Sequence, residues 1–309
     1  MTSPASGNLE AMASTSLEPA KPPAADRAVL LIDCPDQKGL VARVSGLLYE
    51  QGANILHADQ HQDHEQGLFF MRVEWALAGD NPQEELAAFE LAFTPLAQEL
   101  QMRWQLRRME QKPRVAIFCS QYLHCIADLL HSASAGELAC EIALVVSNHR
   151  AAEKLADFHG IPFVHIAVTP ATRDDAEAKQ LALLESFEIE LVVLARYMQI
   201  LTESFVAHYP SAIINVHHSF LPAFIGARPY HAAHARGVKL IGATSHYVTT
   251  VLDDGPIIEQ DVARISHRDQ VEDLIARGRD LERIVLSRAV RWHLEHRILS
   301  YGNKTVVFD

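Results

Sequence analysis

The sequence predicts an α/β protein made of two units, and three observations support this fold class. The chain has 309 residues, 49% of them apolar, which is enough for two ordinary hydrophobic cores. Residues 27–110 read as strand, helix, strand, strand, helix and strand. From residue 111 to 309, near-continuous apolar strands alternate with helices, a pattern typical of a parallel sheet buried on both faces.

The N-terminal unit is expected to be a ferredoxin-like βαββαβ module of about 80 residues. Its first helix is predicted because apolar residues recur at helical spacing and Gly52 follows its end. Residues 1–26, rich in Ala, Ser and Pro, are expected to form a disordered tail. The expected elements are strand 28–33, helix 40–51, strands 54–62 and 68–75, helix 82–100 and strand 102–107.

The C-terminal unit is expected to be Rossmann-like, with a mostly parallel sheet. Pro222, Gly226 and Pro229 are expected to stop regular structure. The expected strands are 115–119, 142–147, 162–166, 191–195 and 213–216, and the helices between them are 123–132, 150–159, 174–187 and 204–209. Further elements are a hairpin-like pair over 238–248 and 257–262, a helix over 271–299 and an edge strand over 304–308.

Composition and charge argue against several classes of protein. The net charge of −12 disfavours nucleic acid or an anionic membrane as the main partner. No run approaches the ~20 apolar residues of a membrane span, and the N-terminus lacks the features of a signal peptide. The four cysteines have no CxxC spacing and are expected to be reduced core residues. The sequence therefore predicts a cytoplasmic protein.

The N-terminal unit resembles an ACT domain. The residues that carry the resemblance are Asp36, Lys38–Gly39–Leu40 at the first strand–helix turn, and Gly52–Ala53–Asn54–Ile55 before and into the second strand. The resemblance implies a regulatory module that pairs with a copy in another subunit, in a dimer or tetramer, and binds an amino-acid effector. A pairing module without a ligand is the alternative. The implied effector contacts are Gly39, Leu40, Asn54 and Ile55.

The stretch from Ala212 to His231 reads as a buried strand that ends in a polar loop, where an α/β sheet presents its chemistry. Asn215 and His217 lie two residues apart, so an extended backbone points both side chains to one face. Asp253 precedes a Gly255–Pro256 turn signal and is expected on a loop. Taken alone, a carboxylate there is more often a turn-former than a catalytic group.

The combined spacing of these residues is much more specific. Over residues 114–262, the chain resembles the formyltransferase family that uses formyltetrahydrofolate. The matching motifs are Asn215-x-His217, Ser219-x-Leu221-Pro222, Gly242-x-Thr244-x-His246 and Asp253-x-Gly255-Pro256. The resemblance implies that Asn215, His217 and Asp253 are catalytic, that His246 lies beside them, and that the loop after strand 191–195 lines a pterin pocket. The residues of that loop are Arg196, Tyr197, Met198, Gln199, Ile200 and Leu201.

The chemistry of formyl transfer suggests a role for each catalytic residue. The Asn215 amide and a protonated His217 would stabilise the oxyanion formed by attack on the formyl carbon. His217 would also protonate the departing folate nitrogen. Asp253 would hold the attacking water, take its proton or keep His217 charged. His218 is given no catalytic role. Neither a metal nor a cofactor is expected, because the histidines 217, 218, 231 and 234 have no Cys or acid at ligand spacing beside them and folate is the substrate.

The acceptor of the formyl group is predicted from the loop after the first strand of the C-terminal unit. In the related transferase that formylates a ribonucleotide, this loop is rich in Gly and Ser, and its backbone N–H groups cradle the phosphate of the acceptor. Cys119–His124 contains no glycine and carries bulky side chains. The missing cradle favours water as the acceptor. The chain as a whole, ACT-like unit included, resembles enzymes that hydrolyse 10-formyltetrahydrofolate to formate and tetrahydrofolate, in one-carbon metabolism that feeds purine synthesis. The alternatives are a formyltransferase with an amine acceptor and an amino-acid sensor with an inactive catalytic domain.

Overall fold

The computed structural model describes residues 26–79, 81–222 and 229–309. Two expectations fall outside the described residues: the disordered tail, of which only Asp26 is described, and the role of Gly226. No helix within these ranges has the length and hydropathy that a bilayer span requires. Within the same ranges the four cysteines are buried and form no disulfide, as predicted.

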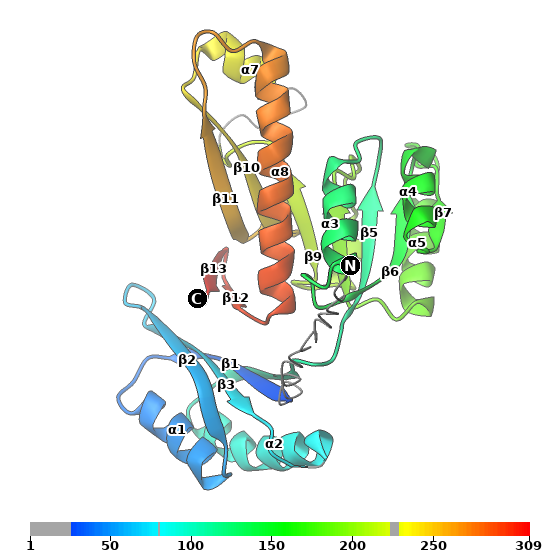
Figure 1. The fold of residues 1–309 in the computed structure, drawn as a ribbon. Coiled ribbons are helices and arrows are strands. Elements are labelled where there is room, and N and C mark those ends of the chain that lie inside the picture. Colours follow the sequence, from blue (N-terminus) through cyan, green and yellow to red (C-terminus); the bar gives the residue numbers. More distant parts are fainter. Residues whose placement is uncertain (1–25, 80, 223–228) are drawn as a thin grey trace, which may run out of the picture.

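The N-terminal unit has the predicted βαββαβ order (Figure 1). Its four strands form an antiparallel sheet in the order β2-β3-β1-β4. Both helices cover one face of this sheet, where Trp75, Phe89 and Phe93 form part of a buried core. The elements are β1 (Arg27–Pro35), α1 (Leu40–Glu50), β2 (Asn54–Asp63), β3 (Leu68–Ala76), α2 (Pro82–Glu99) and β4 (Arg103–Arg108).

The C-terminal unit is built on a seven-stranded sheet in the order β11-β10-β9-β8-β5-β6-β7. The five strands from β9 to β7 are parallel, whereas β10 and β11 are antiparallel to their neighbours. The strands are β5 (Arg114–Cys119), β6 (Glu141–Ser147), β7 (Phe163–His165), β8 (Leu191–Ala195), β9 (Ile213–His217), β10 (Leu240–Tyr247) and β11 (Ile257–Arg264).

The order of the strands in this sheet is enough to predict where a functional site lies. The chain runs outward from β5 through β6 to β7, then returns to β8 and β9 on the other side of β5. Ligands bind at the carboxyl ends of the strands beside such a reversal. Residues that follow β5, β8 and β9 are therefore the candidates for the site.

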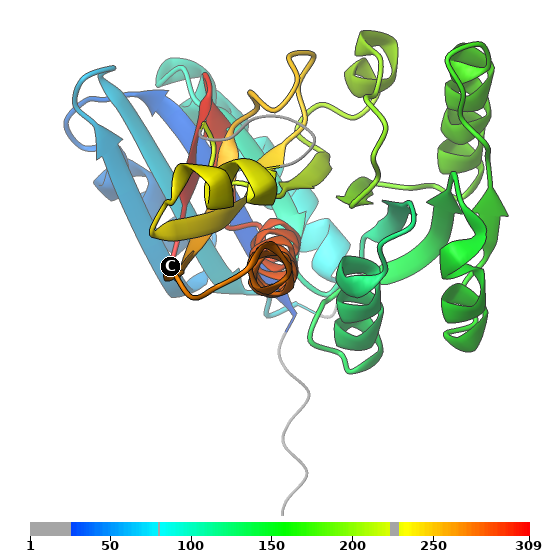
Figure 2. The ribbon, with the colours of Figure 1, turned by 90° about the horizontal axis from the view of Figure 1, so that it is seen from above.

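Helices cover the two faces of the large sheet. The long helix α8 packs on β9, β10 and β11 and against α3, and it is seen end-on in Figure 2. The helices are α3 (His124–Ser134), η1 (Arg150–Ala152, a 3-10 turn), α4 (Glu153–Phe158), α5 (Arg173–Ser186), α6 (Glu203–Ala207), α7 (Pro229–Arg236) and α8 (Val271–Leu294).

Three expectations for the C-terminal part are wrong. Pro229 does not stop regular structure but starts α7, because proline at a first helical position lacks only an N–H that would be unpaired anyway. The last helix ends at Leu294, and residues 298–299 belong instead to β12 (Ile298–Tyr301). The last strand, β13 (Lys304–Val307), pairs with β12 in a separate hairpin and is not an edge of the large sheet.

This C-terminal hairpin joins the two units. The β1–β3 face opposite α1 and α2 packs on it, with the rings of Phe70 and Tyr301 4.5 Å apart. The Tyr301 hydroxyl donates to Asp63 at 3.0 Å, and Nε of Arg72 donates to the carbonyl of His296 at 2.9 Å. The hairpin therefore packs on the N-terminal unit through apolar side chains, and hydrogen bonds at its margins hold the two units together.

Candidate active site

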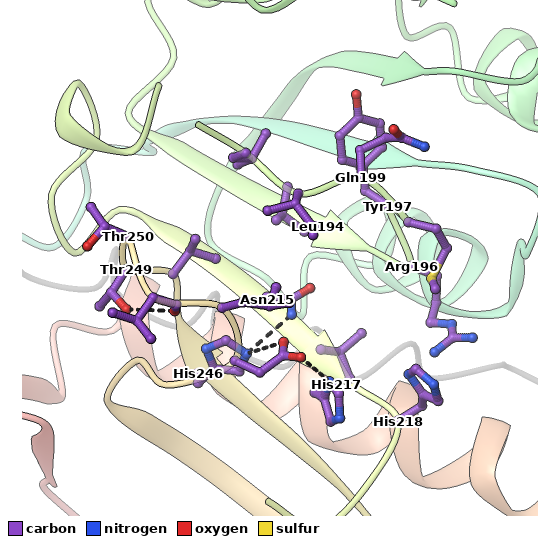
Figure 3. A pocket seen from close by; sticks show the side chains of 18 residues that line it. Leu194, Arg196, Tyr197, Gln199, Asn215, His217, His218, His246, Thr249 and Thr250 are labelled. Carbon is purple, nitrogen blue, oxygen red and sulfur yellow. Dashed lines mark hydrogen bonds and ion pairs between the residues drawn. The ribbon is translucent and has the colours of Figure 1, made fainter. Parts of the chain in front are cut away.

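A cavity of about 350 Å³ opens at the carboxyl ends of β8 and β9 (Figure 3). It is bordered by the ends of these strands, by His246 of β10 and by the loop after β10. All three residues expected to be catalytic, and all seven expected to bind substrate, line this one cavity. Those residues are Asn215, His217 and Asp253, then Arg196, Tyr197, Met198, Gln199, Ile200, Leu201 and His246.

The antiparallel pairing of β9 with β10 brings Asn215 and His246 together, because they are direct cross-strand partners. Nδ1 of His246 donates to the carbonyl oxygen of Tyr247 at 2.9 Å, so Nε2 is the acceptor nitrogen of the neutral ring. Asn215 Nδ2 donates to that nitrogen at 3.2 Å. Burial lowers the pKa of His246, which favours the neutral form. His246 therefore fixes which way the Asn215 amide faces.

His217 and Asp253 form a hydrogen-bonded pair at the same end of the cavity. Nδ1 of His217 lies 3.2 Å from Oδ2 of Asp253, and both side chains are largely buried. The hydrogen bond from His217 lowers the pKa of Asp253 despite burial, so the carboxylate stays ionised. The other oxygen, Oδ1, lies 3.8 Å from Nε2 of His246. Within the described chain, Nε2 of His217 has no hydrogen-bond partner.

Comparison with known proteins identifies the family. A formyl transferase family model matches residues 113–290, and an ACT domain model matches residues 28–88. The chain is 54% identical over 281 residues to the formyltetrahydrofolate deformylase of Synechocystis, covering 91% of this chain and 98% of that protein. The chain belongs to the formyltetrahydrofolate deformylase family.

Solved structures agree with this membership. The formyltetrahydrofolate deformylase of Pseudomonas syringae superposes with a TM-score of 0.89 at 48% identity, over 93% of this chain and 96% of that one. Glycinamide ribonucleotide transformylase 1 of Symbiobacterium toebii superposes with a TM-score of 0.61 at 29% identity. It covers 64% of this chain and 95% of its own. The deformylase family therefore matches nearly the whole chain, whereas the transformylase matches about two thirds of it.

In this deformylase-family chain, Asp253 reaches the histidines through an unusual local conformation. Its φ is 54°, in the left-handed region that side chains other than glycine seldom adopt. The loop then passes against β10, where the N–H of Tyr247 donates to the carbonyl of Pro256 at 3.0 Å. A Cβ added at Gly255 would lie 1.7 Å from the carbonyl oxygen of Tyr247. The Asp-x-Gly-Pro motif thus does more than mark a turn, because the glycine permits the contact that holds Asp253 in place.

Replacing Gly255 by Ala is therefore expected to lower catalytic efficiency about 100-fold, since an ångström-scale misplacement of a reacting group has effects of that size. The added methyl must push the loop off β10 and move Asp253 away from His217. Steady-state kinetics of purified Gly255→Ala would check this. Gly302→Ala is a suitable control because a Cβ there meets nothing within 4 Å, although its φ of 52° adds some backbone strain. Equal loss in both variants would contradict the explanation.

Residues of two other matched motifs, Ser219-x-Leu221-Pro222 and Gly242-x-Thr244-x-His246, bond to each other at the end of β9. Thr244, fully buried on β10, donates to the carbonyl of Ser219 at 2.9 Å and accepts from the N–H of Leu221 at 3.1 Å. Gln260 also donates to the same hydroxyl at 3.0 Å. Thr244 therefore ties the segment after His217 and His218 to the neighbouring strand.

The Arg196–Leu201 loop presents apolar side chains to the cavity region. Met198 and Ile200 are 51% and 57% exposed and are free to cover a flat ligand. The ring of Tyr197 packs in the core, and its hydroxyl accepts from Gln180 at 2.9 Å. The side chain of Arg196 turns toward α8, where Nε lies 3.4 Å from Glu282. These two residues therefore present mainly their backbone to a ligand.

The β5–α3 loop is engaged with its own chain. The Ser120 hydroxyl donates to Asn148 at 2.6 Å and accepts from the N–H of Met198 at 3.2 Å. His124 donates to Glu282 at 2.7 Å, and the Tyr122 ring lies 5.3 Å from the guanidinium carbon of Arg196. The bulky side chains noted in the sequence therefore bond within the protein.

Sequence reasoning missed a buried polar network behind the cavity. Its members come from the loop after β8 and from α3, α7 and α8: Arg196, His124, Tyr230 and Glu282. One signal was present, because Glu282 interrupts the apolar stripe of α8 yet is only 1% exposed. His124, Cys125 and Glu282 are close enough to hold a metal ion. However, the Arg196 guanidinium already supplies a positive charge beside Glu282, and burial raises the pKa of Cys125, which keeps it a thiol.

The expected effector residues do not form one site within a single chain. Gly39 and Leu40 border a surface cavity with His61 and Gln62. This turn lies beside the β2–β3 turn, since the N–H of Asp36 donates to the carbonyl of Gly67 at 2.8 Å. Asn54 and Ile55 begin β2 opposite Ala76 and Trp75, at the far end of the same strand.

Proposed function

We propose that this member of the formyltetrahydrofolate deformylase family hydrolyses 10-formyltetrahydrofolate to formate and tetrahydrofolate in the cavity beside β8 and β9. The observation that carries the proposal is the 3.2 Å contact between Nδ1 of His217 and Oδ2 of Asp253, with Asn215 beside it in the same cavity. The pterin lies along the Arg196–Leu201 loop. The formyl group lies at the end formed by Asn215 and His217.

The reaction needs an oxyanion donor and a proton donor. Water oxygen attacks the formyl carbon, and the carbonyl electrons move onto oxygen. The second amide hydrogen of Asn215 and the imidazolium of His217 donate to that oxyanion. The carbon–nitrogen bond to N10 then breaks, and N10 takes a proton from His217. The proton that Asp253 takes from water returns to His217, and formate leaves as an anion after its hydroxyl proton passes to solvent.

Asp253 serves both the water and the imidazole. Its Oδ2 accepts from Nδ1 of His217 and stabilises the charged ring, leaving Nε2 as the nitrogen that meets the substrate. Its other oxygen, Oδ1, accepts a hydrogen bond from the attacking water and orients a lone pair of that water toward the formyl carbon. Asp253 then takes the proton of the attacking water.

We take water as the acceptor because side chains of the β5–α3 loop are already engaged within the protein. In the β5–α3 loop, Ser120 and His124 are bonded to Asn148 and Glu282, and Tyr122 stacks with Arg196. This arrangement favours hydrolysis over transfer to a phosphate-bearing amine. An inactive sensor domain is disfavoured because the catalytic trio is assembled and has a cavity of its own.

The experiment that tests this function is incubation of the purified chain with 10-formyltetrahydrofolate and no amine. Formate and tetrahydrofolate should appear in equal amounts, at the same rate before and after EDTA treatment. Tetrahydrofolate that forms only after an amine is added would overturn the proposal. Activity that EDTA abolishes and zinc restores would overturn its metal-free chemistry.

We further propose that residues 27–110 are a regulatory unit and that residues 111–309 are the catalytic unit. Within one chain, Gly39 and Leu40 lie at one end of β2, and Asn54 and Ile55 lie at the other. A second copy paired with this unit brings the two sets together across the interface, where they bind an amino acid. The protein then acts as a homo-oligomer.

A further inference from the structure

The buried network of Arg196, His124, Tyr230 and Glu282 has no role in the chemistry derived so far. Its centre is the Glu282 carboxylate, which accepts from His124 at 2.7 Å and from the Tyr230 hydroxyl at 2.8 Å. Burial alone would raise the pKa of Glu282, but the hydrogen bond from His124 and the charge of Arg196 outweigh burial and lower it. The carboxylate is therefore ionised and is held by two hydrogen bonds and by the nearby charge of Arg196.

Tyr230 connects this carboxylate to the catalytic histidine. Its phenol crosses α8 where Gly278 has no side chain, since a Cβ at Gly278 would lie 2.1 Å from the phenol oxygen. The ring also lies beside His218, with 6.3 Å between ring centroids, and the His218 ring lies 5.0 Å from that of His217. Removing the phenol would therefore open space directly behind the histidine pair.

The network is largely buried as well as bonded. Nε and Nη1 of Arg196 are buried and find no hydrogen-bond acceptor within the described residues. Arg196 is held between the Tyr122 ring and Glu282. Burial, followed by the charge of Arg196, lowers the pKa of His218 to about 4, so this ring is neutral near pH 7. On the side of α7 and α8, His217 therefore faces the packed rings of His218 and Tyr230 and, behind them, the Arg196–Glu282 ion pair.

We propose that Arg196, His218, Tyr230, Glu282 and His124 form an acceptor wall that restricts the attacking nucleophile to water. This inference rests on the proposed function and adds a specificity determinant to it. Water and a primary amine attack the same formyl carbon and release the same N10, which takes a proton. Water yields formate, whereas an amine loses one proton and yields an N-formyl amine. The wall selects between them by size, and Tyr230 is its positioning residue.

The test measures where the formyl group goes. Wild type and Tyr230→Ala are incubated with formyl-labelled 10-formyltetrahydrofolate and millimolar glycinamide, and labelled formate and N-formylglycinamide are quantified. Wild type should give formate almost exclusively. In Tyr230→Ala, the ratio of N-formylglycinamide to formate should rise with glycinamide and exceed the wild-type ratio at least about 10-fold. The ratio does not depend on the amount of active enzyme, so partial unfolding leaves it unchanged.

Matched variants keep the test decisive. Tyr230→Leu retains more volume and replaces Tyr230→Ala if that variant does not fold. Tyr301→Phe is the control, since Tyr301 is also a buried tyrosine bonded to a carboxylate but lies in the contact between the units. An unchanged ratio in folded Tyr230 variants, with formate still released, would overturn the acceptor wall alone. Absence of formate from wild type would instead overturn the proposed function.

Discussion

Asp253→Asn is expected to lower the turnover number for formate release about 1000-fold while the protein stays folded. Asparagine has the shape of aspartate but carries no charge, so it neither stabilises a charged His217 nor takes a proton from water. Because the pKa of Asp253 is lowered, wild type retains the carboxylate at every pH above its ordinary value of 3.8. This contribution is lost only as the pH falls through the lowered pKa. A loss of activity between pH 5 and 7 would therefore come from another group.

The neighbouring residue provides the control for this prediction. Asp254 is exposed and does not line the cavity, so Asp254→Asn should keep wild-type turnover. Thermal unfolding of both variants should match wild type within a few degrees, because a change of about 1 kcal/mol shifts the midpoint by only that much in a chain of this size. Normal turnover by folded Asp253→Asn would remove Asp253 from the mechanism.

The second large effect is expected at His217. Glutamine there still donates a hydrogen bond but is not protonated, so His217→Gln should lose general-acid catalysis and lower the turnover number about 1000-fold. KM should change little, since the Arg196–Leu201 loop that binds the pterin is intact. Stopped-flow and steady-state assays of the variant would separate the two constants.

An exposed histidine of the same region serves as the comparison. His231 lies on the outer face of α7, and His231→Gln should behave as wild type. If His217→Gln raises KM and leaves the turnover number unchanged, His217 binds substrate and does not transfer the proton.

The site was predictable where local rules act. Asn215 and His217 share a face because they are two apart on a strand, and β9 continues through His217. The motifs shared with the formyltransferase family then identified Asp253 and His246 as site residues, although they lie on other elements. Two contacts were not readable in this way: the direct pairing of Asn215 with His246, which depends on the register of β9 with β10, and the contact of Gly255 with β10.

The network around Glu282 could not be predicted from the sequence, because its residues are far apart along the chain. His124 and Glu282 are 158 positions apart and meet only when α3 packs on α8. Tyr230 depends on α7, which was missed because Pro229 was interpreted as a breaker and not as a first helical residue. The end of α8 at Leu294 was likewise hidden, since apolar residues continue into β12 and pack in the contact between the units. Tertiary packing decides each of these cases.

The central claim is that the site formed by Asn215, His217 and Asp253 delivers the formyl group to water. A single-turnover reaction in ¹⁸O-labelled water, with enzyme in excess over 10-formyltetrahydrofolate and no amine present, tests it most directly. The predicted result is one formate for each tetrahydrofolate, with ¹⁸O in the formate and at least about 1000-fold slower release by Asp253→Asn. Formate release at equal rates from wild type and Asp253→Asn, or no labelled formate from wild type, would contradict the claim.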